Sequence, residues 1–264
     1  MMAARKDAMG AQVRESSAVP CLTLRGLSKH FGGLQAVKDI TLEIHPGNRM
    51  GILGPNGAGK TTLFHLITGV LAPTSGQVLL FGQDVTRWPP HRRTTLGMAR
   101  TFQITTLFPK LTVLDNVLLA VQGRRRMKFV MWRPLLSYRD VYEKARVLLE
   151  GVGFWDRRQM EIRHLSHGEQ RQLEIVLALA SDPQLLLLDE PVAGLSTGES
   201  QQMAGFLHRL DPGLAILMIE HDMDVAFAVA DSITVLHYGE IVEAGSLDQI
   251  RTSPRVRDIY LGTR

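Results

Sequence analysis

The fold of this chain is decided by one glycine-rich stretch, Gly54-Pro55-Asn56-Gly57-Ala58-Gly59-Lys60-Thr61-Thr62. The strand-like run 50–53 leads into it, and apolar residues at helical spacing follow, namely Leu63, Leu66, Ile67 and Val70. Glycines let the backbone amides of such a loop wrap around phosphate groups, and the N-terminus of the next helix favours negative charge. The order of strand, glycine loop and helix therefore predicts a phosphate-binding loop rather than an ordinary glycine turn.

Two side chains of this loop carry most of its expected chemistry. The ammonium group of Lys60 is expected to contact the β and γ phosphates of a nucleotide. The hydroxyl of Thr61 is expected to ligate Mg²⁺, which neutralises the oxygens where charge develops. The predicted nucleotide-binding residues are the whole stretch, Gly54, Pro55, Asn56, Gly57, Ala58, Gly59, Lys60, Thr61 and Thr62.

A second motif consists of four leucines followed by two acids, Leu185-Leu186-Leu187-Leu188-Asp189-Glu190. This pattern is typical of a buried strand that delivers carboxylates at its carboxyl end. Successive strand residues point in opposite directions, so the two acids take different roles. Asp189 is expected to hold Mg²⁺, mostly through water, and Glu190 to polarise the attacking water as general base. A solvated turn is the alternative, but together the two motifs predict a P-loop NTPase.

A third motif, Leu165-Ser166-His167-Gly168-Glu169-Gln170, precedes a strong helical pattern. Ser166 and Glu169 satisfy the capping-box rule, so one interpretation is simply a well-capped helix. The functional interpretation uses the same physics. The Ser166 hydroxyl, the Gly168 amide and the positive helix end form an anion site for a γ-phosphate held by another subunit.

The remaining elements are ordered as in an α/β protein. Strand-like segments come first, at 22–24, 36–44, 50–53 and 77–81. From residue 166 onward helices and strands alternate, with helices at 169–181, 199–210 and 223–230, strands at 185–188 and 214–219, and a strand-like tail at 232–243 before a small helix after Ser246. Such alternation implies crossover connections and a parallel sheet covered on both faces.

Between these two parts the chain changes character. Residues 88–152 are mostly helix-like, and two helix starts match capping boxes, Thr112 with Asp115 and Asp140 with Glu143. We therefore predict a helical subdomain at about 90–165, inserted in one domain of residues 21–264. Residues 1–20 contain no apolar stretch of signal-peptide length and are predicted to be a disordered extension.

Composition excludes several classes of protein. The chain has 264 residues, 45% of them hydrophobic, which is enough to form a full hydrophobic core. Its 30 basic residues exceed its 26 acidic ones only slightly, so the net charge is weak evidence for nucleic-acid binding. Cys21 is the single cysteine, which favours a reducing cytosol. The longest apolar runs are far shorter than the ~18 to 20 residues that span a bilayer, so we expect the chain itself to cross no membrane.

The motifs and their order strongly resemble those of ABC ATPases, from residue 22 to the C-terminus. The motifs include Arg100-Thr101-Phe102-Gln103 and Ile219-Glu220-His221-Asp222-Met223. The resemblance implies an α/β fold, a P-loop NTPase core with an antiparallel β subdomain and an inserted helical subdomain. It also implies ATP as the nucleotide. By this resemblance Gln103 senses Mg²⁺ and the attacking water, and His221 contacts the γ-phosphate. Phe31 would stack on adenine, unless it is a plain hydrophobic residue at a strand end.

Within that family the sequence looks like the ATPases of branched-chain amino-acid importers. The motif Ala99-Arg100-Thr101-Phe102-Gln103 and the ending Ser253-Pro254-Arg255 to Tyr260-Leu261-Gly262 carry this likeness. The implied partners are membrane permeases, a second ATPase subunit and, indirectly, a periplasmic or extracellular solute-binding protein, with no nucleic acid. The implied location is the cytoplasmic face of the inner membrane, peripherally. An exporter, or an importer of urea, amides or aromatic acids, is the nearer alternative; a soluble protein acting on nucleic acid or ribosomes is a remote one.

Three features leave questions open. His167 stands where the commonest signature has glycine, and Ser196 replaces the usual Asp or Asn after Ala193-Gly194-Leu195, which puts coupling across the subunit interface in doubt. Residues 123–134 are rich in basic side chains, Arg124, Arg125, Arg126, Lys128 and Arg133. That stretch is either a solvated loop or a contact with the permease or with anionic lipid headgroups.

Overall fold

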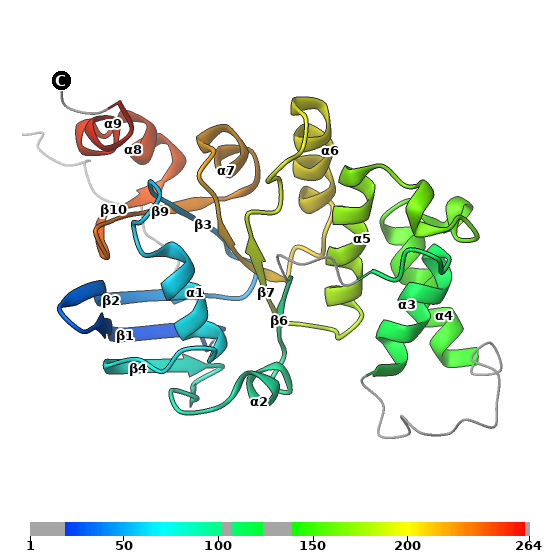
Figure 1. Cartoon of the computed structure of the whole chain (residues 1–264), viewed down its shortest axis with the longest axis horizontal. Helices are drawn as coiled ribbons and strands as arrows, with labels where there is room; N and C mark the ends of the chain where they lie inside the picture. The colour runs from blue at the N-terminus through cyan, green and yellow to red at the C-terminus, as the bar shows by residue number, and fades with distance from the viewer. Residues whose placement is uncertain (1–18, 102–106, 124–138, 262–264) are drawn as a thin grey trace, which may run out of the picture.

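The computed structural model describes residues 19–101, 107–123 and 139–261, and it places two β-sheets and their helices in layers (Figure 1). Gln103, the stretch 124–133 and most of the predicted extension 1–20 lie outside the described residues. None of the helices in the described ranges has both the length and the apolar character needed to cross a bilayer.

The smaller sheet is antiparallel, as the resemblance implied. Its strand order is β2-β1-β4-β5. The strands are β1 (Leu22–Phe31), β2 (Leu34–Ile44), β4 (Ser75–Leu80) and β5 (Gln83–Asp84). Strands β1 and β2 form a hairpin whose tip holds Phe31 opposite Leu34, because Gly32 takes a φ of +58° that a glycine tolerates. The antiparallel β subdomain is confirmed.

The larger sheet has six strands in the order β10-β9-β3-β8-β7-β6. The strands are β3 (Arg49–Leu53), β6 (Met98–Arg100), β7 (Leu185–Asp189), β8 (Ala215–Ile219), β9 (Ser232–His237) and β10 (Glu240–Ser246). All neighbours are parallel except β10, which pairs antiparallel with β9. Ile219 pairs with Ile52 of β3 and with Asp189 of β7, so these three strands end side by side. Whatever follows each of them meets at one edge of the sheet.

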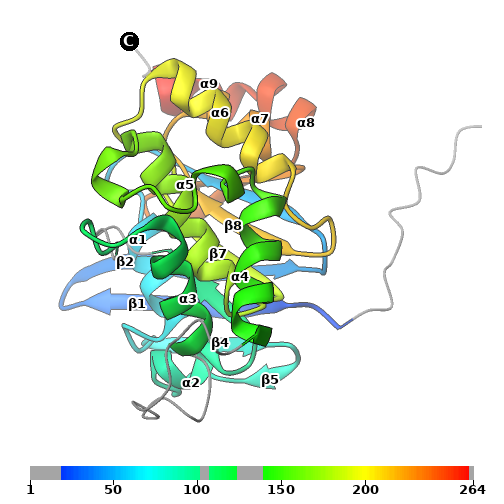
Figure 2. The same cartoon turned by 90° about the vertical axis from the view of Figure 1, so that its right-hand side faces the viewer.

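Helices separate and cover the sheets (Figures 1 and 2). They are α1 (Lys60–Thr68), α2 (Pro90–Thr94), α3 (Val113–Gly123), α4 (Arg139–Gly151), α5 (His167–Leu179), α6 (Thr197–His208), α7 (Met223–Val229), α8 (Leu247–Thr252) and α9 (Pro254–Leu261), with the short 3₁₀ turns η2 (Trp155–Arg157) and η3 (Ile162–His164). Helices α3 and α4 lie side by side at one end of the molecule (Figure 1).

Alternation along β7 explains how two cores meet at one sheet. Leu185 and Leu187 are buried in a core with α1 and the antiparallel sheet. Leu186 and Leu188 are buried in a second core with helices α3 to α7. Because successive side chains of a strand point to opposite faces, the run of leucines is the sequence expected of a strand buried on both sides.

The stretch 88–152 is less helical than its sequence pattern indicates. Met98–Arg100 forms the edge strand β6, which pairs with β7, so these residues belong to the six-stranded sheet. Helix α4 already contains Arg139, which places Asp140 inside its first turn and makes the predicted cap at Asp140 wrong. The predicted cap at Thr112 is confirmed, because its hydroxyl accepts from the Asp115 amide at 3.1 Å. The insertion at about 90–165 stays a prediction.

The C-terminal end of α1 is closed by a buried arginine. The Arg93 guanidinium is 1% exposed and donates to the carbonyl oxygens of Leu66 at 2.8 Å and Ile67 at 2.7 Å. It also donates to the carbonyls of Thr86 and Trp88, both at 3.0 Å. Burial lowers the pKa of Arg93 to about 10. The four carbonyl acceptors satisfy a charge that would otherwise be costly to bury.

Replacing Arg93 with methionine is expected to lower the free energy of unfolding by about 3 kcal/mol, since buried carbonyls would lose their donors. Urea unfolding followed by circular dichroism measures this change. Methionine at the exposed Arg87 is the matched control and is expected to change stability by less than about 0.5 kcal/mol. Equal effects at the two positions would contradict the structural role of Arg93.

Candidate functional site

A pocket of about 630 Å³ lies at the carboxyl end of β3, against the phosphate loop. The glycine loop, the β1–β2 hairpin and the end of β7 all contribute to it. Its lining residues are Phe31, Gly33, Leu34, Gln35, Ala36, Lys38, Asn56, Gly57, Ala58, Gly59, Lys60, Thr61, Thr62, Glu190 and Tyr238. The structure therefore brings the predicted nucleotide-binding loop, Phe31 and Glu190 together around one open space.

Two glycines let the loop pass close to neighbouring backbone. A Cβ at Gly54 would lie 2.3 Å from the carbonyl oxygen of Leu236, and one at Gly59 would lie 2.4 Å from that of Ala36. Gly59 also has a φ of +101° and is the N-cap of α1, where no side chain caps the helix. The first-turn amides and the positive helix end are thus left for an anion.

Lys60 lies at the base of the pocket and is 5% exposed. Its Nζ donates to the carbonyl oxygens of Gly54 at 2.5 Å and Pro55 at 3.1 Å. Burial lowers the pKa of Lys60, while the carboxylates of Glu190, Glu220 and Asp189 act to raise it. The ammonium group is therefore held inside the loop by carbonyl groups, where a phosphate oxygen can replace them.

The two acids after the leucines lie in different surroundings. Asp189 is 1% exposed and forms an ion pair with Arg100 of β6 at 2.8 Å. The Glu190 side chain is 32% exposed, lines the pocket and lies 3.6 Å from Nδ1 of His221. Glu190 also has a φ of +46°, an uncommon conformation for a residue with a long side chain. The end of the strand thus turns sharply to direct Glu190 to the pocket.

Oxygen donors suitable for Mg²⁺ are present at this site. The Thr61 hydroxyl lines the pocket. The Asp189 carboxylate lies at the carboxyl end of β7, where it pairs with the Arg100 guanidinium. Among the described residues no group of three or more His, Cys, Asp or Glu side chains could hold a metal by itself. The donor set fits a Mg²⁺ ion that takes its other ligands from phosphate oxygens and water, which is how Mg²⁺ commonly binds with nucleotides.

Glu220, immediately before His221, is a charged residue in an apolar place. It is 0% exposed, and within the described part of the chain neither carboxylate oxygen has a hydrogen-bond partner of ordinary geometry. Desolvation raises the pKa of Glu220 to about 8, although the backbone amides of Val192 and His221 oppose the rise. Burial therefore disfavours the charged form of this carboxyl group. This environment could not be predicted from the sequence, because Glu220 stands in a motif whose visible feature is the histidine.

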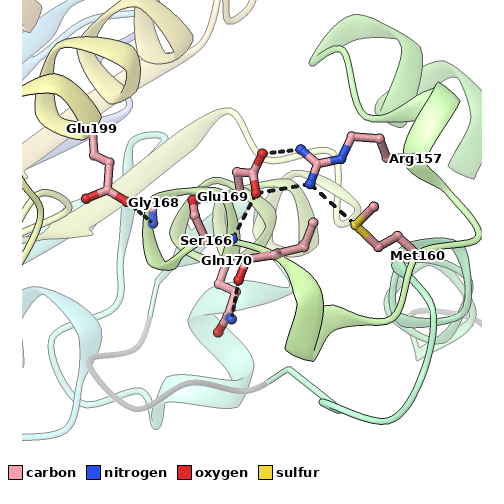
Figure 3. Close-up of polar contacts among 8 residues, drawn as sticks. Arg157, Met160, Ser166, Gly168, Glu169, Gln170 and Glu199 are labelled. Carbon is pink, nitrogen blue, oxygen red and sulfur yellow. Dashed lines mark hydrogen bonds and ion pairs between the residues drawn. The ribbon is translucent and has the colours of Figure 1, made fainter.

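The third motif begins helix α5 as predicted (Figure 3). The Ser166 hydroxyl accepts from the Glu169 amide at 3.3 Å, and the Glu169 carboxylate accepts from the Ser166 amide at 2.9 Å. The Gly168 amide donates to Oε1 of Glu199 at 3.1 Å. Arg157 forms a two-pronged ion pair with Glu169. Ser166 is exposed, and neither Ser166 nor Gly168 lines the phosphate-loop pocket.

Three arginines of this region were not assigned a role from the sequence. Arg100 neutralises Asp189 and Arg157 anchors α5, as described above. Arg171 of α5 donates to the backbone carbonyls of Asp189 at 3.4 Å and Glu190 at 3.3 Å. Arg100 stands inside a recognisable motif and Arg171 directly follows one, but their partners are distant in sequence. These contacts join α5 and β6 to the strand that carries the acids.

Comparisons with known proteins agree with the motifs. A family described as ABC transporter matches residues 37–193. The high-affinity branched-chain amino acid transport ATP-binding protein LivG of Escherichia coli (strain K12) is 36% identical over 252 residues, covering 92% of this chain and 98% of that protein.

Solved structures show the same fold. The ADP conformation of MJ1267, an ATP-binding cassette of an ABC transporter, superposes with a TM-score of 0.81 at 28% identity, covering 92% of this chain and 99% of that one. A dimeric post-hydrolysis state of the cassette MJ0796, bound to ADP and Pi, has a TM-score of 0.69 at 25% identity and covers 86% and 98% of the two chains.

Proposed function

The chain belongs to the ABC transporter family, in which it is an ATP-hydrolysing subunit, and we propose that it powers import of branched-chain amino acids or related small solutes. The observation that carries the substrate class is the 36% identity to LivG across 98% of that protein. The solute itself would touch separate membrane subunits and a binding protein, so no residue of this chain is assigned to it.

ATP would occupy the pocket at the phosphate loop. The amides of the loop and of the first turn of α1 would surround the phosphates, and the Lys60 ammonium would exchange its carbonyl acceptors for β- and γ-phosphate oxygens. Phe31 is 46% exposed at the tip of the β1–β2 hairpin, with the Lys29 ammonium 5.1 Å from the centre of its ring, and its ring would stack on adenine. Tyr238 lines the same pocket and is 73% exposed, which makes it a second aromatic surface for the base.

Mg²⁺ would be held by the Thr61 hydroxyl and, mostly through water, by Asp189, with Gln103 assigned by resemblance alone. When bound, Mg²⁺ supplies positive charge that neutralises the phosphate oxygens during transfer. Arg100 already pairs with Asp189 at 2.8 Å. Arg100 therefore stabilises the buried carboxylate while no metal is near it.

Glu190 is proposed as the general base for the attacking water. It lines the pocket beside the loop, and its carboxylate is exposed enough to reach a water molecule. His221, 3.6 Å away, is proposed to contact the γ-phosphate and to orient Glu190. Arg171 fixes the backbone at Asp189 and Glu190, which limits movement of both carboxylates.

A second copy or a related ATPase subunit is proposed to complete the site. The anion site at Ser166 and Gly168 lies outside the phosphate-loop pocket, so it would receive the γ-phosphate of another chain. The dimeric structure of MJ0796 with ADP and Pi is a precedent for such an assembly. In a head-to-tail pair, two nucleotides would be sandwiched, and hydrolysis would release the contacts that keep the pair closed.

The membrane subunits are proposed to dock near the helical segment. A groove of about 370 Å³ lies next to Arg100 and Thr101 and includes the exposed Phe108 and Leu119. An exposed apolar groove rimmed by polar groups is typical of a protein contact. The chain would thus be a peripheral protein at the cytoplasmic face of the membrane, receiving signals from the solute-binding protein through the permeases.

The substrate class is tested by reconstitution in proteoliposomes with candidate permease subunits and a candidate solute-binding protein. We expect binding protein loaded with leucine, isoleucine or valine to raise ATP hydrolysis about tenfold in proteoliposomes and to drive uptake of the same amino acid. A binding protein without solute is the control. Stimulation only by urea, amides or aromatic acids would contradict the substrate class, and outward movement of solute would contradict import.

A further inference from the structure

The amide of Gly168 already has an acceptor in this structure. It donates to Oε1 of Glu199, which lies in the first turn of α6, at 3.1 Å (Figure 3). The proposed function gives this same amide to the γ-phosphate bound by the second subunit. One N–H group cannot make a good hydrogen bond to two anions at once, because its preferred direction is narrow. The carboxylate and the phosphate therefore compete for one donor.

Glu199 is well placed to occupy that donor and also to leave it. Its other oxygen, Oε2, accepts from the amide of Ser196 at 3.0 Å and from the hydroxyl of Ser196 at 2.8 Å. These bonds from Ser196, followed by the bond from Gly168, hold the pKa of Glu199 below its usual range. The charged side chain can stay on Ser196 through Oε2 while Oε1 turns away from Gly168.

The absence of a side chain at position 168 permits this contact. A Cβ at Gly168 would lie 3.1 Å from Oε1 of Glu199 and 3.2 Å from its Cβ and Cγ. Such distances are tight for a carbon atom, so any other residue here would push the glutamate away. Gly168 thus serves the close approach of Glu199 as well as the approach proposed for a phosphate.

Helix α5 does not depend on Glu199 for its own anchoring. Its N-terminus has a complete capping box between Ser166 and Glu169. Both terminal nitrogens of Arg157 donate to the Glu169 carboxylate. The bond from Gly168 to Glu199 is therefore an additional contact between two helices, made at the one position where an incoming anion is expected.

We propose that Glu199 is a built-in competitor for the γ-phosphate, which occupies the Gly168 amide in the separate subunit and must release it before the ATP-bound dimer can close. This inference rests on the proposed shared site. Glu199 would then help to set the ATP concentration at which the dimer closes. Ser196 would contribute to this, because its amide and hydroxyl hold the Glu199 carboxylate.

The test is ATP-dependent dimerisation measured by sedimentation in a Glu190→Gln background, in which hydrolysis is removed. Glu199→Gln weakens the competing bond, and Glu199→Asp keeps the charge but is too short to reach Gly168. Each is expected to lower the dimer dissociation constant roughly tenfold, because two competitors are removed per dimer and each contributes about threefold. Neither variant is expected to raise the melting temperature. Glu150→Gln, at an exposed ion pair with Arg146, is the matched control and should change neither quantity.

Dimerisation that is unchanged or weaker in both Glu199 variants would overturn the inference, since a merely structural glutamate would loosen the fold and the dimer together. Tighter dimerisation with Gln but not with Asp would also overturn it, because simple charge repulsion would then explain the effect. The shared site is checked separately with Ser166→Arg in the same background. If that variant dimerises with ATP as well as its parent, the proposed function fails, and this inference fails with it.

Discussion

Replacing Glu190 with glutamine is expected to lower ATP turnover by about a thousandfold while ATP affinity stays near that of the unaltered protein. Glutamine has the same shape but cannot accept a proton from water, and the contacts of the loop with phosphates do not involve position 190. ATP should therefore remain intact in the site, and the protein should accumulate as an ATP-bound dimer. Phosphate release and size-exclusion chromatography in Mg-ATP measure the two effects.

A matched substitution separates the role of Glu190 from that of acidity in general. Glu174, also close to the end of β7 and paired with Arg171 at 2.8 Å, is the control position. Glu174→Gln is expected to keep turnover within about tenfold, since Glu174 lines no part of the phosphate-loop pocket. Turnover of Glu190→Gln within a few-fold of the unaltered protein would count against its role as general base.

The phosphate loop could be predicted from sequence because its chemistry is local. Glycine is required at positions 54 and 59 because backbone carbonyl groups of other segments lie close to them. Lys60 and Thr61 directly follow Gly59, in the first turn of α1. The edge at which the acids and His221 meet could be predicted as well, because consecutive parallel strands end together. The register of Ile52, Ile219 and Asp189 supports that expectation.

Contacts between distant segments could not be predicted in this way. Arg100 and Asp189 are 89 residues apart, and Gly168 and Glu199 are 31 apart. Each pair depends on how helices and strands pack, which no local pattern encodes. Strand β6 was missed for the same reason, since a run of three residues is stabilised by its pairing with β7 rather than by its own propensity.

Ser196 shows how a departure from a family pattern can acquire a physical explanation. Its replacement of the usual Asp or Asn put interface coupling in doubt. In the structure Ser196 is the N-cap of α6, in a capping box with Glu199. A serine hydroxyl caps a helix about as well as aspartate. The serine also donates to the glutamate, which an ionised aspartate could not do.

The other large effect is expected from Ser166→Arg, which should bind ATP normally as a monomer and yet lose hydrolysis by about a thousandfold. Ser166 is exposed and lies outside the phosphate-loop pocket, so an arginine there leaves the loop intact. The bulky side chain would instead block the approach of the second subunit's nucleotide. Ser166→Ala removes the hydroxyl without adding bulk, so it should cost about 1 kcal/mol of stability and lower hydrolysis much less than Ser166→Arg does.

Mixing Ser166→Arg protein with Lys60→Ala protein should restore part of the lost activity. Lys60→Ala removes the charge that meets the β and γ phosphates, so alone it should bind ATP weakly and not turn over. In a mixed dimer, the first chain supplies an intact phosphate loop and the second an intact Ser166, so one of the two sites is complete.

Equal mixing gives half mixed dimers, so recovery to roughly a quarter of normal turnover is expected if the two sites act independently. A mixture that stays inactive, although both variants are folded and mixed dimers form, would show that the site is not shared or that its two copies are not independent. Normal hydrolysis by Ser166→Arg alone would reduce Ser166 to a helix cap.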